Sequence, residues 1–158
     1  MTKQIFTALT LLLFSGFLLT SCKKEKPNVV PGTTEYLAGK WLVTHFAYDD
    51  NRNKKLDEQE KESAGYGDEL SIFFSTDGTG YTSWYSYYDS SSETDNFTWK
   101  LENNDKNIRM ITDYGYGADT TYMKIYELNI DKCILESNEN YGYGPDYTEW
   151  VIMQKQRQ

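Results

Sequence analysis

Oxygen-bearing side chains recur at alternate positions along one charged segment, residues 49–60 (DDNRNKKLDEQE). This spacing fits the twelve-residue loop that binds Ca²⁺, in which side-chain ligands alternate and a glutamate closes the site at the last position. Leu56 occupies the apolar eighth position, and the residue before it would offer its backbone carbonyl. The sequence therefore predicts a calcium site with the ligands Asp49, Asn51, Asn53, Lys55, Asp57 and Glu60.

This segment resembles an EF-hand or dockerin-type loop that is entered from a strand instead of a helix. It departs from that pattern at Lys54, where glycine normally supplies a turn at positive φ. Arg52, Lys54 and Lys55 also dilute the negative charge of the three carboxylates. The resemblance implies weak affinity, about 10⁻⁴–10⁻³ M, as in extracellular modules. The alternative is a solvated charged insertion in which residues 57–63 form a helical turn.

A second kind of candidate chemistry is aromatic. Residues 113–119 (DYGYGAD) and 140–146 (NYGYGPD) share the pattern YGYG-x-D, and residues 84–88 (WYSYY) are also rich in aromatic side chains. Tyrosines on glycine-flexible loops can stack and donate hydrogen bonds, which suits sugars or flat aromatic ligands. The alternative is that these rings pack over the fold for its own stability. We predict a small-molecule or carbohydrate site formed by Tyr114, Tyr116, Tyr141, Tyr143, Trp84 and Tyr87.

The single histidine, His45, alternates with Trp41 and Val43 and is predicted to point into the fold beside them. It is a further candidate for contacting a ligand, although a lone histidine is also a common structural residue. The chain has no nucleophile elbow, paired-histidine metal set or glycine-rich phosphate loop. Acid pairs such as Asp49/Asp50 are expected in so acidic a chain, so the sequence predicts neither catalytic residues nor an enzyme.

Composition places the chain among single folded domains. It has 158 residues, only three prolines, and 14 tyrosines and four tryptophans, which favour strands and wet binding surfaces. A formal net charge of −8 argues against nucleic acid, which needs a basic surface. The charge is compatible with cations and with neutral partners. We expect a monomer.

Residues 1–22 have the pattern of a secretory signal: Lys3 precedes an apolar core, residues 5–19, that is too short to span a bilayer. The segment ends in Leu-Thr-Ser-Cys, which resembles the bacterial lipobox. The resemblance implies cleavage before Cys22 and lipidation of that cysteine, with the protein held at the bacterial envelope, on either face of the outer membrane. The alternative is an ordinary signal peptide with an incidental cysteine. Residues 23–36 are polar with two prolines, as in a flexible tether. Cys133 is then unpaired and is expected to be a buried small hydrophobe.

Residues 37–158 carry strand signals and little helical periodicity. Tight turns are expected at 77–78, 103–106 and 131–132, and long connections at 49–68, 89–96, 114–119 and 140–146. In an up-and-down meander the tight turns share one end and the long connections the other, which describes a cup with one closed end. Poor alternation at residues 125–126 indicates a bulge. The predicted strands are residues 40–48, 69–76, 79–88, 97–102, 107–113, 120–130, 132–139 and 147–155.

Four short motifs in this pattern resemble the lipocalin-like domains of bacterial lipoproteins across residues 37–155. They are Gly39-Lys40-Trp41 at the first strand, the hairpin at 74–80 (FSTDGTG), Phe97-Thr98-Trp99, and Trp150-Val151-Ile152 in the last strand. The resemblance implies an all-β fold, an eight-stranded up-and-down antiparallel barrel. It also implies that Trp41 fills the closed end and that Lys155 or Arg157 packs on it.

The turn at residues 129–132 lacks the fuller pattern of animal lipocalins, so their small hydrophobic ligands are not carried over. The resulting hypothesis is a lipid-anchored binding protein that holds a small or glycan-like ligand at a tyrosine-rich mouth facing away from the membrane. The alternative is an interaction or inhibitor module that uses the barrel as a scaffold without a ligand cavity.

Overall fold

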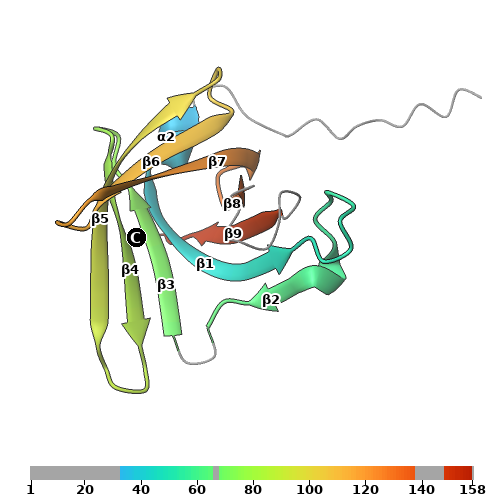
Figure 1. Ribbon diagram of the computed structural model, residues 1–158, viewed down its shortest axis with the longest axis horizontal. Coiled ribbons are helices and arrows are strands. Elements are labelled where there is room, and N and C mark those ends of the chain that lie inside the picture. Colours follow the sequence, from blue (N-terminus) through green and yellow to red (C-terminus); the bar gives the residue numbers. More distant parts are fainter. Residues whose placement is uncertain (1–32, 66–67, 138–147, 158) are drawn as a thin grey trace, which may run out of the picture.

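The computed structural model describes residues 33–65, 68–137 and 148–157, which form one antiparallel sheet closed into a barrel (Figure 1). Strands that follow one another in sequence pair from β3 to β9, and the β1–β9 pairing closes the barrel. The predicted eight-stranded up-and-down barrel is confirmed, with β2 as an additional short strand beside β1. The elements are α2 (Thr33–Leu37), β1 (Gly39–Tyr48), the 3-10 turn η1 (Glu58–Glu60), β2 (Lys61–Ser63), β3 (Asp68–Phe74), β4 (Thr79–Ser86), β5 (Ser92–Glu102), β6 (Asn107–Asp113), β7 (Ala118–Leu128), β8 (Lys132–Ser137) and β9 (Glu149–Lys155).

Strand β5 differs most from the sequence prediction. It begins at Ser92 instead of residue 97, because residues 92–96 pair in register with Tyr81–Tyr85 of β4. The predicted long connection at 89–96 is therefore wrong, and the β4–β5 loop is only residues 87–91. Backbone pairing in the hairpin outweighs the low strand propensity of these polar residues. Strand β6 has the predicted bounds.

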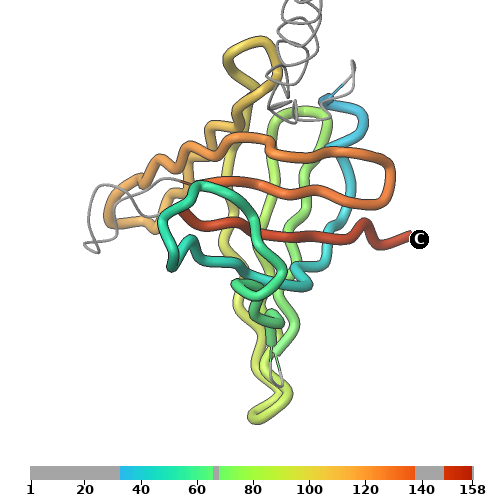
Figure 2. Tube along the Cα trace, turned by 90° about the vertical axis from the view of Figure 1, so that its right-hand side faces the viewer, coloured from blue at the N-terminus to red at the C-terminus, as the bar shows by residue number. Residues whose placement is uncertain are grey.

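Strand β1 pairs along one edge with β9 and along the other with two strands in succession. Its first half faces β3, with Trp41 opposite Ile72, and its second half faces β2, with His45 opposite Ser63. The chain leaves this ladder between Ser63 and Asp68. As a result, the rimward parts of β3, β4 and β5 extend past the β1 contact and project from the barrel (Figure 2). We call residues 68–70, 82–86 and 92–96 the arm.

A set of contacts around Trp41 closes the end opposite the arm. The Trp41 side chain is fully buried, and its Nε1 donates a hydrogen bond to the Leu37 carbonyl at 2.7 Å. Lys155 Nζ lies 5.0 Å from the centroid of the Trp41 ring and donates to the Tyr36 carbonyl at 2.7 Å. The predicted roles of Trp41 and Lys155 are confirmed, whereas Arg157 pairs with Asp131 instead.

Helix α2 includes the last residues of the expected tether, 33–36, so this described part of the segment is helical and Thr33 is buried. Through its Leu37 and Tyr36 carbonyls, α2 connects the start of β1 to the end of β9. Burial lowers the pKa of Lys155. Its ammonium group is favoured there by the Trp41 ring and the carbonyl.

The core fills the closed half of the barrel. Trp99 Nε1 donates to the carbonyls of Ser75 and Thr79, at 3.1 and 2.9 Å, and its ring meets Phe74 edge-on. Cys133 is buried, as predicted, and burial raises the pKa of its thiol. Each fully buried large apolar side chain contributes roughly 1.5–3 kcal/mol relative to exposure. The cluster consists of Leu37, Trp41, Val43, Ile72, Phe74, Phe97, Trp99, Ile108, Met110, Ile125, Leu128, Cys133, Leu135, Val151 and Met153.

Gly39→Ala is expected to destabilise the barrel by roughly 1–3 kcal/mol, because Gly39 has φ +126°, where an L side chain is strained. An added Cβ would also lie 2.9 Å from Lys155 Cε and displace that side chain from the Trp41 ring. Urea unfolding measures the loss. The matched control is Gly117→Ala, since nothing lies within 4 Å of a Cβ there. If Gly39→Ala and Gly117→Ala were equally stable, glycine would not be required at position 39, and this prediction would be contradicted.

Candidate functional site

The inward-facing positions of the rimward half follow from the strand register, since directly opposed residues of an antiparallel pair share a face. Leu70 packs against the core and lies opposite Trp84, which in turn lies opposite Glu93. Phe46 also packs against the core and lies opposite Glu62 and Val151. Above the packed core, the inner wall therefore includes charged residues such as Glu62 and Glu93, which the core itself lacks.

Trp84 and Tyr87 lie at the arm. Trp84 faces inward but is 52% exposed, whereas the other three tryptophans are buried. Tyr87, in the loop after β4, is 60% exposed, donates to Glu69 Oε2 at 3.5 Å and packs edge-on against Tyr85. Both predicted residues therefore present open aromatic surface, but Trp84 lies on the inner face and Tyr87 lies beside the outward-facing Glu69 and Tyr85.

Tyr114 and Tyr116 lie in the β6–β7 loop and stack on each other, with ring centroids 5.9 Å apart. Tyr116 is 90% exposed and Tyr114 is 44% exposed. Gly115 has φ +80°, and its N–H donates to Asp113 Oδ1 at 2.8 Å, which shapes the turn. Tyr141 and Tyr143 lie outside the described residues.

The Tyr114–Tyr116 stack does not meet the aromatic residues at the arm. The β4–β5 hairpin extends from one side of the barrel and the β6–β7 hairpin from another (Figure 2). Within ranges 33–65, 68–137 and 148–157, no ring contact joins Trp84 or Tyr87 to Tyr114 or Tyr116. The rim thus carries separate aromatic surfaces.

The prediction that His45 points into the barrel is wrong. The β1–β9 register shifts between Val43 and His45, so the alternation slips and Phe46, not His45, faces the core. His45 lies opposite Ile152, which belongs to a cluster on the outer face. The predicted bulge in β7 is confirmed between Ile125 and Glu127, where it turns Tyr126 outward onto Trp150.

The charged loop between β1 and η1 folds back over the outside of the barrel (Figure 2). Its Leu56 packs against a second buried cluster formed by Ala47, Ile134, Trp150 and Ile152. Trp150 is fully buried by this arrangement. The loop therefore starts at the rim but covers the outer wall. Of residues 57–63, for which the alternative interpretation expected a helical turn, 58–60 form a 3-10 turn and 61–63 form strand β2.

The predicted calcium ligands are joined by hydrogen bonds. The buried carboxylate of Asp49 accepts from the N–H groups of Asn53 and Lys54, at 2.8 and 2.9 Å. Lys54 adopts φ +57°, so lysine supplies the turn that glycine usually makes. The amides of Asn51 and Asn53 donate to Asp57 Oδ2, at 3.2 and 2.7 Å. The bonds from Asn53 and then Asn51 lower the pKa of Asp57.

These residues fit Ca²⁺ in donor chemistry but are not gathered as a metal cluster. Glu60 Oε1 accepts the Asn51 N–H at 3.2 Å, while its buried Oε2 has no hydrogen-bond partner in the described part of the chain. Nowhere among the described residues do three or more His, Cys, Asp or Glu side chains form a group that could hold a metal ion. Asparagine oxygens and the Lys55 carbonyl would have to complete such a site.

Sequence reasoning missed the acidic inner wall. Glu93 and Asp95 on β5 face inward with Trp84 and Thr82, and Asp68 faces inward at the start of β3. Across the mouth, burial and then the charges of Glu149 and Glu62 raise the pKa of Tyr48. The available signal was the charge pattern, because residues 62–99 contain seven acidic and no basic side chains.

A groove of about 530 Å³ lies on the outer face of β4, β5 and β6. Phe73 and Tyr81 stack on one side of it, with centroids 5.1 Å apart, and Ile111 and Asp113 line the other. No motif predicted this groove. Its size lies within the range of small-molecule sites, although it opens away from the barrel interior.

The model of the lipocalin-like domain family matches residues 37–135. The chain belongs to the lipocalin-like domain family. The matched region begins at Leu37, which holds the indole of Trp41, and ends at Leu135 in β8. Members of this fold commonly bind small hydrophobic ligands.

Two solved structures, insecticyanin and an amine binding protein, agree with the fold. Insecticyanin from the tobacco hornworm Manduca sexta is 15% identical with a TM-score of 0.57, covering 82% of this chain, and the chain spans only 65% of its length. The amine binding protein of Rhodnius prolixus, solved with tryptamine, is 11% identical with a TM-score of 0.50, covering 85% and 70% of the two chains. An uncharacterized protein from Bacteroides eggerthii is 17% identical with a TM-score of 0.47, covering 76% and 99%. A comparison with curated proteins gives no match. None of the described helices has the length and apolar character needed to cross a bilayer.

Proposed function

We propose that this lipocalin-like domain is a non-enzymatic, lipid-anchored envelope protein that binds a small or glycan-like ligand at the rim of its barrel. The observation that carries the proposal is the division of the interior. Bulky side chains fill the closed half, while exposed aromatic rings stand at the rimward ends of β4 and β6. A ligand would therefore contact the rim, where stacking and phenol hydrogen bonds are available.

Tyr114→Ala with Tyr116→Ala is expected to weaken ligand binding about tenfold, because an aromatic contact contributes roughly 0.5–1.5 kcal/mol beyond its buried area. Ligands that travel with the purified protein are identified by native mass spectrometry, and their affinities are measured by calorimetry. The control is Tyr122→Ala, since Tyr122 is 51% exposed but pairs with Arg109 on the outer face. Equal affinities for all three proteins would contradict the proposal.

The alternative is an interaction module with no ligand in the barrel, and the filled core is the observation that favours it. The affinity of the protein for small molecules distinguishes the two functions. A scaffold would bind none of a panel of glycans and aromatic small molecules, whereas the proposed function requires saturable binding of at least one.

We further propose a weak Ca²⁺ site in the loop at residues 49–60. Its support is the set of hydrogen bonds that joins Asp49, Asn51, Asn53, Asp57 and Glu60. The left-handed turn at Lys54 and the Glu60 Oε2, which has no partner within the described chain, add to it. Rotation of the Asn51 and Asn53 amides would present oxygen in place of N–H toward Asp57. The ion would supply positive charge that this set of carboxylates lacks.

About 10 mM Ca²⁺ is expected to stabilise the folded state by about 1.4–2.7 kcal/mol, if the dissociation constant is ~0.1–1 mM. The shift in melting temperature measures the effect, with Mg²⁺ for comparison. Glu60→Gln and Asp57→Asn should abolish the shift. Glu58→Gln, in the same loop but outside the ligand set, should retain it. A melting temperature that Ca²⁺ does not change would sink the proposal.

The lipid anchor rests on the lipobox-like sequence ending at Cys22. The mature protein is expected to begin at Cys22, to carry acyl chains on its N-terminal peptide, and to partition into a detergent phase. Mass spectrometry of that peptide checks the modification. Cys22→Ala should remain in the aqueous phase, while Cys133→Ala, which alters only a buried thiol, should still partition with detergent. An unmodified, soluble wild type would contradict the anchor.

A further inference from the structure

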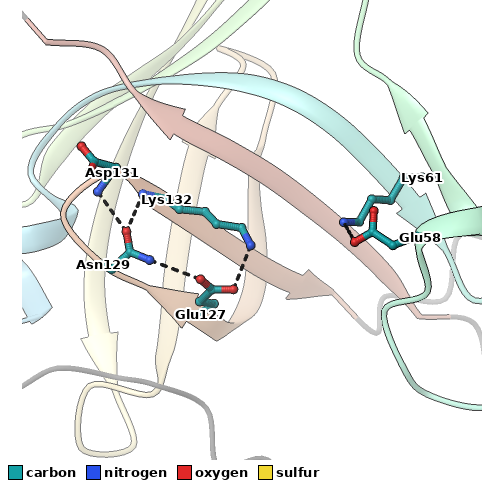
Figure 3. Close-up of polar contacts among 6 residues, drawn as sticks. All are labelled: Glu58, Lys61, Glu127, Asn129, Asp131 and Lys132. Atoms are coloured by element: carbon teal, nitrogen blue, oxygen red, sulfur yellow. Dashed lines mark hydrogen bonds and ion pairs between the residues drawn. The ribbon is translucent and has the colours of Figure 1, made fainter.

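Charge sign is sorted between the two faces of the barrel wall. On the rimward half, the charged side chains that face inward in the described strands are all acidic. The basic residues of the described strands face outward, because each lies opposite an outward-facing residue. The exception is Lys155 at the closed end. Lys61 and Lys132, for example, pair with Glu58 and Glu127 outside the barrel (Figure 3). The inward acids are Glu62, Asp68, Glu93, Asp95, Asp119 and Glu149.

The inner face of the arm combines these acids with apolar surface. Trp84 lies directly opposite Leu70 on one side and Glu93 on the other, and Asp95 follows two residues later on the same face of β5. Opposed side chains in an antiparallel pair are separated by only about 4.5–5.5 Å at Cβ. An exposed indole is thus bordered by two exposed carboxylates.

Asp68 adds a third carboxylate near the tip of the arm, four residues along β4 from the level of Asp95. It lies opposite Ser86 and faces inward, and its Oδ1 is buried without a hydrogen-bond partner in the described residues. A buried carboxylate oxygen is costly unless a donor or a cation meets it. In the part of the chain that the structure describes, β1 pairs with β3 only as far as Leu42 and then with β2, so β1 does not run beside this end of β3.

We propose that the inner face of the arm binds a small organic cation, an amino group attached to an aromatic or apolar body. This inference rests on the proposed ligand binding at the rim and names the ligand class. The body stacks on Trp84 and Leu70, and the ammonium group lies between the indole face and the carboxylates of Glu93 and Asp95. Asp68, nearer the tip of the arm, adds negative potential. Glu62, Glu149 and Asp119, on the other inward-facing positions, add negative potential that attracts the cation to the mouth.

A matched series of ligands isolates the charge: 2-phenylethylamine, 2-phenylethanol and phenylacetate share a phenyl ring and differ in charge. The amine is expected to bind at least about tenfold more tightly than the alcohol, and phenylacetate more weakly than both. The preference should shrink as NaCl rises from low to physiological concentration, because these carboxylates are exposed. Calorimetry measures the affinities. Fluorescence quenching locates the ligand, since Trp84 alone among the four tryptophans is exposed.

The variant Glu93→Gln/Asp95→Asn should reduce the amine preference to about twofold while leaving the affinity for 2-phenylethanol unchanged. Its matched control is Glu58→Gln/Asp131→Asn, which removes the same net charge from exposed positions on the outer face. That control should retain the preference. Unchanged thermal unfolding verifies that both variants are folded.

Equal affinity for the three compounds would overturn the cationic ligand class and leave rim binding standing. An amine preference that survives Glu93→Gln/Asp95→Asn would overturn the assignment to the arm. Failure of all three compounds to bind at millimolar concentration would also overturn this inference. The proposed function would then be judged by the Tyr114 and Tyr116 variants, which act on a separate surface.

Discussion

The cation–π and hydrogen-bond set around Trp41 is the constraint on which the barrel depends. Lys155, the last residue of β9, lies over the ring of a residue near the start of β1, so the contact joins the two strands whose pairing closes the sheet. The same lysine and the indole N–H also hold two carbonyls of α2. The contacts of one buried ring therefore join β1, β9 and α2 at this end of the barrel. The proposed ligand-binding surfaces accordingly lie at the other end.

Much of this could be predicted from the sequence, because strand alternation and turn chemistry are local. The closed end was predicted from Gly39, Trp41 and Lys155. The bounds of β6 were predicted from the alternation of residues such as Ile108 and Met110 with polar neighbours. Residues 92–96 were interpreted as loop because Glu93, Asp95 and Asn96 are of residue types that are depleted in strands. These residues form a strand because they pair with β4, and the propensities of single residues do not report such pairing.

The candidate site was less predictable than the fold for a related reason. One register slip after Val43 moves His45 to the outer face, and period-two reasoning has no means of placing such a slip in advance. The loop at residues 49–60 was expected at the rim, yet Leu56 draws it onto Trp150. The exposed rings of Trp84, Tyr87, Tyr114 and Tyr116 were found by composition, but their division into two surfaces depends on where each hairpin points. The inward acids became visible only once register assigned a face to each residue.

The two bulges and the folded-back loop together make the β8–β9–β1 wall apolar on both sides. Leu135 and Val151 face the core, while Ile134, Trp150 and Ile152 face the loop. This wall is thus the middle layer of a three-layer stack, more like a strand buried in an α/β protein than one in a solvated barrel. The loop at residues 49–60 is consequently part of the folding unit. Leu56 must therefore stay apolar if Trp150 is to remain covered.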